Sequence, residues 1–155
     1  MLVHDHEVLT SQVEHVTALV RGLFDRSFAP GALHEELLQQ IDSLRDQMLE
    51  HFGFEEEAAF PFILTVLPEN AAALRALSAA HERIVRCLAE FVDLVRLTSK
   101  DTLELQMGPI AAALERFTNA YDSHVNEESE LLDVIEEQLT ASQRQALSDI
   151  ARKLL

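Results

Sequence analysis

Apolar residues recur every three or four positions along four long blocks of this sequence. This spacing is typical of helices that each bury one face. The four stripes are Leu9, Val13, Val16, Val20 and Leu23; Leu37, Ile41, Leu44 and Met48; Leu74, Leu77, Ile84, Leu88, Phe91 and Val95; and Ile110, Leu114, Phe117, Tyr121 and Leu131. The sequence therefore predicts an all-α fold.

Glycine and proline mark the expected ends of these blocks. Only four of each occur, and the prolines and two of the glycines lie at Pro30-Gly31, Pro61, Pro68 and Gly108-Pro109. We expect helices from near Leu2 to about Arg26, from Gly31 to about Ala58, from Asn70 to about Ser99, and from Pro109 to about Glu137. Four long helices with short connections favour an antiparallel up-down four-helix bundle over residues 2–137.

A short C-terminal helix is expected over about 140–155. Thr140 and Gln143 have the spacing of a capping box, and Leu147, Ile150 and Leu154 follow on one face. With 155 residues, of which 48% are hydrophobic, the chain is large enough to bury one core without disulfides. We therefore expect one domain spanning 1–155.

Charge and cysteine content limit the partners and the compartment. The formal charge is −15, from 12 Lys and Arg against 27 Asp and Glu, so the surface repels phosphate backbones and attracts cations. We expect no nucleic-acid partner. The apolar stretch Ala58 to Leu67 is too short to span a bilayer, and the single Cys87 cannot form an intrachain disulfide. Since no leader pattern is evident, we expect a cytoplasmic protein with no membrane partner.

Histidine and glutamate interrupt the apolar stripes in a repeated pattern. His51-x-x-x-Glu55 matches His124-x-x-x-Glu128, and His6-Glu7 matches His81-Glu82. Two residues four apart lie on one face of a helix, so a His and a Glu at that spacing can reach one metal ion. Two helical hairpins related by a pseudo-twofold axis would bring all four histidines to one level of the bundle.

The inward carboxylates Glu55 and Glu128 call for a cation. Buried carboxylates are costly unless they are paired or metal-bound, and their neighbours on the stripes are apolar. Imidazole and carboxylate donors suit iron, manganese or zinc. Two metal ions fit a set of six donors better than one. The predicted metal ligands are His6, His51, Glu55, His81, His124 and Glu128.

The other three histidines are expected to lie away from this site. His15 is nine residues from His6, which places it on the opposite face of the helix and about 13 Å along the axis. His4 is about 200° around the helix from His6 by the same geometry. His34 is in the first turn of the second block, far from His51.

The sequence resembles the hemerythrin-like, or HHE cation-binding, family over about Val3 to Glu137. The block from His51 to Pro61, HFGFEEEAAFP, is similar to the family signature, and His124-x-x-Glu127-Glu128 is similar to its second copy. The resemblance implies two iron ions with an oxo or hydroxo bridge. His6 and His51 would bind one iron and His81 and His124 the other, with Glu55 and Glu128 as bridges.

One departure from the oxygen-carrying members affects the expected function. They have an additional histidine one turn from the ligand in the third helix, whereas Leu77 and Val85 occupy those positions here. One iron would then keep a further open position or take another ligand. Tyr121, one turn before His124, is the nearest candidate, as a ligand or as a hydrogen-bond donor to bound peroxide. The alternative is a core tyrosine whose hydroxyl is satisfied locally.

Residues near the predicted ligands have expected supporting roles. Glu56, Glu57 and Glu127 are surface residues or partners that orient the ligand imidazoles. Phe52, Phe54, Phe60 and Phe62 are expected to pack the core and keep the site dry. Gly53, costly in a helix interior, is expected to allow close packing of a neighbouring helix.

The sequence thus predicts a non-haem di-iron protein that binds or reacts with dioxygen, peroxide or nitric oxide, as a carrier, sensor or stress-response protein. Two alternatives are a peroxide-decomposing enzyme, which would use the additional open position, and a bundle for iron storage or sensing. A bundle that serves only for protein interaction is disfavoured, because inward histidines and glutamates without metal would destabilise it. A ferritin-like oxidase is disfavoured because that class uses Glu-x-x-His motifs and more carboxylates.

Overall fold

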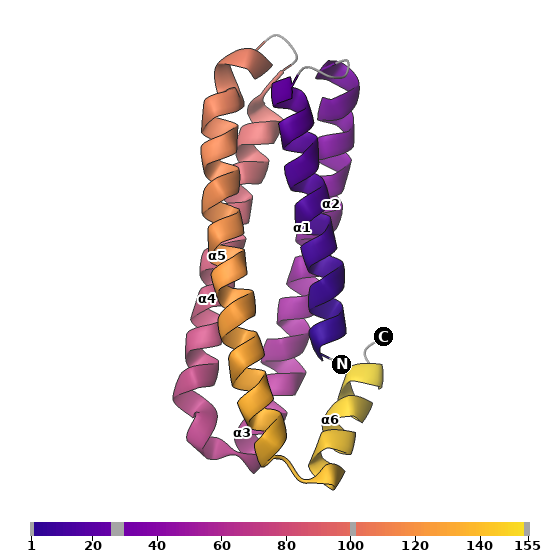
Figure 1. The fold of residues 1–155 in the computed structure, drawn as a ribbon, viewed down its shortest axis with the longest axis vertical. Coiled ribbons are helices and arrows are strands. Elements are labelled where there is room, and N and C mark those ends of the chain that lie inside the picture. The colour runs from indigo at the N-terminus through magenta and orange to yellow at the C-terminus, as the bar shows by residue number, and fades with distance from the viewer. Residues whose placement is uncertain (1, 26–29, 100–101, 154–155) are drawn as a thin grey trace.

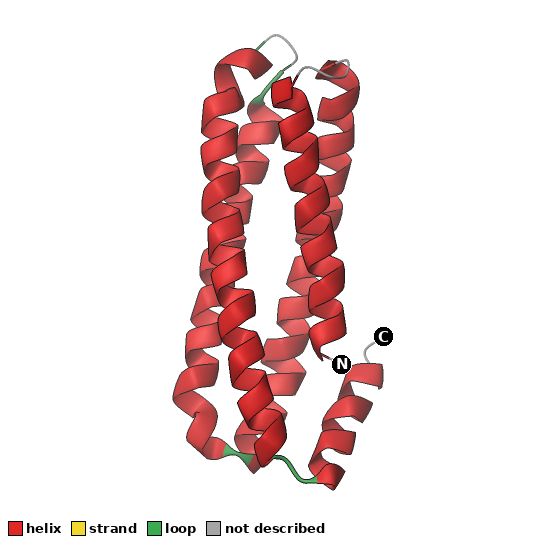
Figure 2. Ribbon diagram, viewed as in Figure 1, coloured by secondary structure: helices red, strands yellow, loops and turns green. Residues whose placement is uncertain are grey.

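The computed structural model describes residues 2–25, 30–99 and 102–153, and helices make up nearly all of this part of the chain (Figure 2). The elements in chain order are α1 (Leu2–Asp25), α2 (Pro30–Phe54), the π-helical turn η1 (Glu55–Ala59), α3 (Phe60–Val66), the 3₁₀ turn η2 (Pro68–Asn70), α4 (Ala71–Leu97), α5 (Leu103–Gln138) and α6 (Ala141–Lys153). The predicted all-α class is confirmed.

The long helices α1, α2, α4 and α5 lie side by side (Figure 1). Helix α1 packs against α2 and α5, and α4 packs against the same two helices. The chain reverses direction between consecutive long helices, and α6 folds back beside the N-terminal end of α1. This arrangement brings the N-terminal part of α1, the end of α2 and the middle of α4 and α5 to one level.

The buried apolar residues form two separate clusters. The larger one lies between the long helices and consists of Leu9, Val13, Val16, Val20, Leu23, Leu37, Ile41, Leu44, Met48, Phe52, Ile84, Leu88, Phe91, Val92, Val95, Ile110, Ala113, Leu114, Phe117 and Tyr121. The smaller one consists of Ala59, Phe60, Ile63, Leu74, Leu77, Leu132, Ile135, Leu139 and Leu147. The predicted stripes are therefore buried, except that the last stripe passes through buried Leu132 and leaves Leu131 only partly buried.

The second predicted helix does not end near Ala58. It continues through the π turn into α3, and Pro61 lies in the first turn of α3. In a regular α-helix the proline ring collides with the carbonyl of the residue four positions earlier. The wider π turn, in which the Phe60 N–H donates to the Glu55 carbonyl oxygen, makes room for the ring and keeps the helix going. Reading Pro61 as a break was therefore wrong.

The last long helix begins more than a turn before the predicted start. Helix α5 starts at Leu103, so Pro109 lies inside the helix. Pro109 and Gly108 are both exposed, so a carbonyl left unpaired by the missing proline N–H faces water. The predicted end of the first helix at Arg26 lies outside the described residues.

The C-terminal helix follows its predicted capping pattern. The Thr140 N–H donates to Gln143 Oε1 (2.9 Å), and the Gln143 N–H donates to Thr140 Oγ1 (3.2 Å). Leu147 is buried in the smaller apolar cluster, which anchors α6 to the end of the bundle. Leu154 lies outside the described residues. Within the part of the chain that the structure describes, none of the helices combines the length and apolar content needed to cross a membrane.

Candidate metal centre

A layer of histidine and glutamate side chains separates the two apolar clusters. Six of them, which we call the polar layer, come from five elements: His6 from α1, His51 from α2, Glu55 from η1, His81 from α4, and His124 and Glu128 from α5. The glutamates are fully buried, and the histidines are 1–8% exposed. All six predicted metal ligands are therefore brought together at one level of the bundle.

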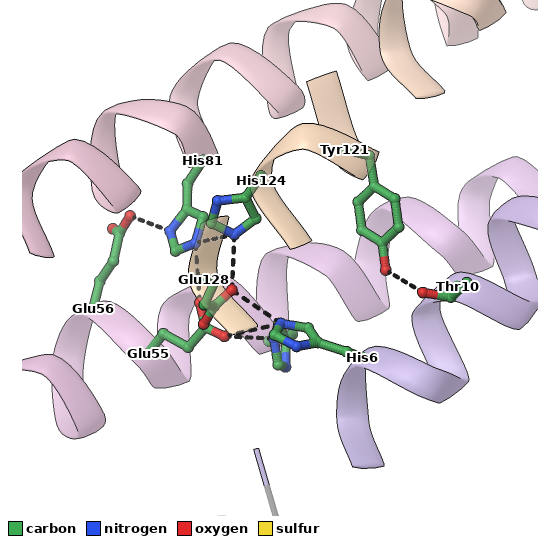
Figure 3. Close-up of polar contacts among 9 residues, drawn as sticks. His6, Thr10, Glu55, Glu56, His81, Tyr121, His124 and Glu128 are labelled. Atoms are coloured by element: carbon green, nitrogen blue, oxygen red, sulfur yellow. Dashed lines mark hydrogen bonds and ion pairs between the residues drawn. The ribbon is translucent and has the colours of Figure 1, made fainter. Parts of the chain in front are cut away.

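Glu55 contacts three imidazoles, and Figure 3 shows its carboxylate between His6 and His81. Its Oε1 is 2.6 Å from His51 Nε2 and 3.5 Å from His6 Nε2. Its Oε2 is 3.0 Å from His81 Nε2. One carboxylate thus faces two separate groups of imidazole nitrogens, one through each oxygen.

Glu128 also contacts imidazoles from two different helices. Its Oε2 is 3.0 Å from both His6 Nε2 and His124 Nε2, and the Nε2 atoms of His81 and His124 are 3.1 Å apart. Two groups of possible metal-ligand atoms, each with all members within 4.8 Å of one another, follow from these contacts. The first is Glu55, His81, His124 and Glu128, and the second is His6, His51 and Glu55.

Despite these close contacts, several polar atoms of the layer have no well-aligned hydrogen bond. Both oxygens of Glu55 and of Glu128, together with His6 Nε2 and His51 Nε2, are buried and have no well-aligned hydrogen-bond partner among the described residues. Buried polar atoms are normally hydrogen-bonded, and a group of them pointing at one another is costly. Lone pairs that converge in this way fit coordination of cations, and nitrogen and carboxylate oxygen are donors that iron, manganese and zinc accept.

In the metal-free protein, protons supply the positive charge of this layer. Burial alone would lower the pKa of His6, but the adjacent carboxylates of Glu128 and Glu55 outweigh burial and raise this pKa to about 10. Burial also opposes ionisation of Glu55, yet the imidazoles of His51, His6 and His81 hold the pKa of Glu55 well below its usual range. In the metal-free layer a protonated His6 therefore faces an ionised Glu55, and a metal ion bound there would displace that proton.

Two phenylalanines cover the side of the site that faces α4. The Phe52 ring is stacked on the His81 imidazole, with 3.9 Å between centroids and 9° between planes, and its edge-to-face contact with His124 is 5.7 Å between centroids. Phe60 lies on His81 with centroids 6.0 Å apart. These contacts hold the orientation of the two imidazoles. Phe54 and Phe62 pack against the smaller apolar cluster, as expected from the sequence.

Tyr121 is buried above the polar layer, and its hydroxyl contacts Thr10. The two oxygens are 3.1 Å apart, and Figure 3 shows the phenol turned toward α1. Burial raises the pKa of Tyr121 to about 12, so the phenol is protonated at neutral pH. Thr10 was not predicted as this partner. Its spacing of four from His6 indicates the shared helix face, but the contact with Tyr121 is between two helices.

The remaining candidates lie elsewhere, as far as the structure describes them. His15 is exposed and is 3.8 Å from Glu36, as the helix geometry predicted. His34 is 3.1 Å from the Val95 carbonyl oxygen, near the far end of α4. The side chain of His4 lies outside the described residues. Leu77 and Val85 pack against the apolar clusters, so neither replaces the additional histidine of oxygen carriers.

The three other glutamates differ in what they contact. Glu127 is exposed and accepts a hydrogen bond from Ser123 Oγ (3.0 Å). Glu57 is exposed and contributes to a surface groove. Only Glu56 approaches a ligand imidazole: its Oε1 is 2.8 Å from His81 Nδ1.

Two surface hollows reach the layer from the side of His6 and His51. A groove of about 830 Å³ lies beside His51 and is lined by Val8, Leu9, Gln47, Leu49, Glu50, Gly53, Phe54, Glu57, Ala58 and Ala151. A smaller hollow of about 300 Å³ lies beside His6 and is lined by Glu7, Thr10, Ser11, Glu14, Val125 and Ser129. A Cβ on Gly53 would meet no atom within 4 Å. The expectation that Gly53 allows close helix packing was therefore wrong.

Fold and site together define a helical protein whose interior holds a His/Glu cluster suited to cations. A family model, that of the hemerythrin HHE cation binding domain, matches residues 1–152, and the chain belongs to this family. This confirms the resemblance seen in the sequence. The searches of curated proteins and of solved structures found no significant match.

Proposed function

We propose that this chain is a non-haem di-iron protein that binds or reacts with a small oxidant such as dioxygen, peroxide or nitric oxide. The observation that carries the proposal is the position of Glu55, whose two oxygens face two different groups of imidazoles. A carboxylate so placed can bridge two metal ions. In this proposal the chain forms a single domain, an antiparallel four-helix bundle of the hemerythrin type with a C-terminal helix.

The six residues of the polar layer would divide between the two irons. His6 and His51 would hold one iron, His81 and His124 the other, and Glu55 and Glu128 would contact both. The observed grouping of donor atoms supports the division of the histidines and the shared position of Glu55. Glu128 belongs to the group of His81 and His124, and its Oε2 is also 3.0 Å from His6 Nε2. Zinc or manganese would accept the same donors. Bound iron supplies redox chemistry and a coordination position for a small ligand.

The protein's own residues would control the entry of a small ligand, the exclusion of water from the site and the supply of protons. The two hollows beside His51 and His6 favour entry of a small ligand on that side, while Phe52 and Phe60 shield the other. A protonated Tyr121 hydroxyl, 3.1 Å from Thr10, is a proton donor held near the layer. We propose that Tyr121 serves in this way and not as a ligand, since its oxygen is engaged by Thr10.

A peroxide-decomposing reaction is the second candidate. It is favoured by the residues near His81: with Leu77 and Val85 where oxygen carriers have a histidine, the six donors leave more than one coordination position open. We further propose a cytoplasmic location, with no nucleic-acid or membrane partner, because of the charge of −15 and the single cysteine.

Optical spectroscopy of the iron-loaded, oxidised protein tests the proposal. We expect near-ultraviolet charge-transfer absorption that shifts when azide is added. A colourless protein with zinc as its only metal would overturn the assignment of iron. Oxygen evolution from added peroxide, measured with an oxygen electrode, would favour the enzyme; absorption that responds to azide without oxygen evolution would favour a carrier or sensor.

A further inference from the structure

Glu56 follows Glu55 in the chain, yet both carboxylates contact the same imidazole. Glu55 Oε2 is 3.0 Å from His81 Nε2, and Glu56 Oε1 is 2.8 Å from His81 Nδ1. The two glutamates therefore hold opposite edges of the ring (Figure 3). In an α-helix consecutive residues are about 100° apart around the axis, so two neighbours rarely reach one partner.

The π turn explains this shared contact. Both glutamates are in η1, where the hydrogen bond spans five residues instead of four. A wider turn contains more residues, so the angle between neighbours is smaller than in an α-helix. The turn that accommodates Pro61 thus also directs Glu55 into the polar layer and brings Glu56 around the outside of His81.

The contact with Glu56 distinguishes His81 from His124. His81 Nδ1 has a carboxylate acceptor, whereas His124 Nδ1 is buried without a hydrogen-bond partner among the described residues. A carboxylate that accepts the N–H of a metal-bound imidazole fixes its tautomer and orientation and makes the other ring nitrogen a better donor. The other nitrogen here is Nε2, which faces Glu55 and His124 inside the layer.

We propose that Glu56 is a positioning residue: it holds His81 as the Nδ1–H tautomer, with the Nε2 lone pair directed into the layer, and strengthens the metal position formed by His81 and His124. The effect on metal binding rests on the proposed function, whereas the effect on the tautomer of His81 does not. It also assigns the effect to Glu56 alone, because Glu57 lies in the surface groove and Glu127 pairs with Ser123.

The test compares Glu56→Ala and Glu56→Gln with the neighbouring control Glu57→Ala. Because the Glu56 side chain is 41% exposed, its loss removes little packing, and circular dichroism should show an unchanged fold. We expect Glu56→Ala to bind Fe²⁺ about 10–100-fold more weakly at one of the two metal positions. Glu56→Gln should fall between, since a neutral amide oxygen still accepts the hydrogen bond. Glu57→Ala should match the parent.

Two further measurements separate positioning from a merely structural role. The midpoint potential of the iron-loaded protein should rise in Glu56→Ala, because a weaker imidazole donor stabilises the ferric state less, and should not change in Glu57→Ala. Nitrogen-15 NMR of the metal-free protein, at a pH high enough to leave the His81 imidazole neutral, should show the Nδ1–H tautomer in the parent and a mixture of tautomers in Glu56→Ala. Equal affinities and potentials in the Glu56→Ala and Glu57→Ala proteins would overturn the proposal. If the parent binds no iron, the proposed function fails and the NMR result alone decides the role of Glu56.

Discussion

The larger apolar cluster and the polar layer lie next to each other in the same bundle but are stabilised differently. In the cluster, side chains such as Phe91 and Phe117 are fully buried and need only neighbours of matching shape. In the layer, Glu55 and Glu128 are equally buried, and their charged oxygens contact imidazole nitrogens without well-aligned hydrogen bonds among the described residues. The packing of the larger apolar cluster needs only the folded chain, whereas the buried carboxylates of the polar layer need protons or metal ions to balance their charge.

The largest effect expected in the cluster comes from Phe117→Ala. Truncating a fully buried phenylalanine removes its transfer free energy and leaves a cavity, so unfolding by denaturant should show a loss of about 4 kcal/mol. The folded fraction should still bind the parent amount of metal, because Phe117 is not among the donors. Loss of metal in protein that remains folded would show that the two regions are not independent.

Removing the metal should lower the free energy of unfolding through the polar layer and leave the helical fold intact. A ligand that binds only the folded state adds about 2.7 kcal/mol of stability when its free concentration is a hundred times its Kd. Denaturant unfolding before and after treatment with a chelator should show a loss of that size, with helical circular dichroism retained. An unchanged midpoint would mean that the layer needs no cation.

The pH dependence of the metal-free protein should come from the same layer. The pKa of His6 is raised from 6.5 to about 10, so its stabilising contribution is fully present below pH 6.5 and is lost as the pH rises through 10. The pKa of Glu55 lies below 4.5, so its contribution is present above pH 4.5 and is lost as the pH falls. The thermal midpoint should therefore be highest between about pH 4.5 and 6.5.

Metal should change that profile. Since metal replaces the protons of the layer, the thermal midpoint of the loaded protein should not fall between pH 6.5 and 9. The matched control is the His15→Ala variant, whose substituted residue is exposed. Without metal, it should show the same pH profile as the metal-free parent. A parent that shows the same profile with and without metal would contradict the assignment of these protons.

The smallest expected effect is a gain in stability from Gly53→Ala. Glycine in a helix interior is less favourable than alanine by about 1 kcal/mol, and a Cβ at this position would meet no atom within 4 Å. Denaturant unfolding should show a gain of about 0.5–1 kcal/mol. A loss of stability in Gly53→Ala would show that the groove beside His51 needs the glycine.

The sequence predicted what depends on periodicity. The apolar stripes gave the helices, and the two His-x-x-x-Glu pairs, with His6 and His81 on stripes of their own, indicated which polar side chains point inward. These features are local, because a helix of regular pitch places residues four apart on one face. The capping box at Thr140 was predictable for the same reason.

The features that the sequence did not predict depend on tertiary contacts. Pro61 was interpreted as a break and Pro109 as the start of a helix, because nothing local indicates that a π turn will accommodate Pro61 or that the last long helix will begin earlier and contain Pro109. The Glu56 contact with His81 requires both the π turn and the placement of α4 beside η1. Thr10 was missed because its partner, Tyr121, is on another helix.

Metal content per chain tests the central claim most directly. We would measure it by elemental analysis in the iron-loaded parent, in His51→Ala and in the matched surface variant His15→Ala. We expect about two irons per chain in the parent and in His15→Ala, one for each group of donor atoms, and a clear loss in His51→Ala. A parent with one iron or none, or a loss in His15→Ala, would contradict the account of the polar layer as a two-metal centre.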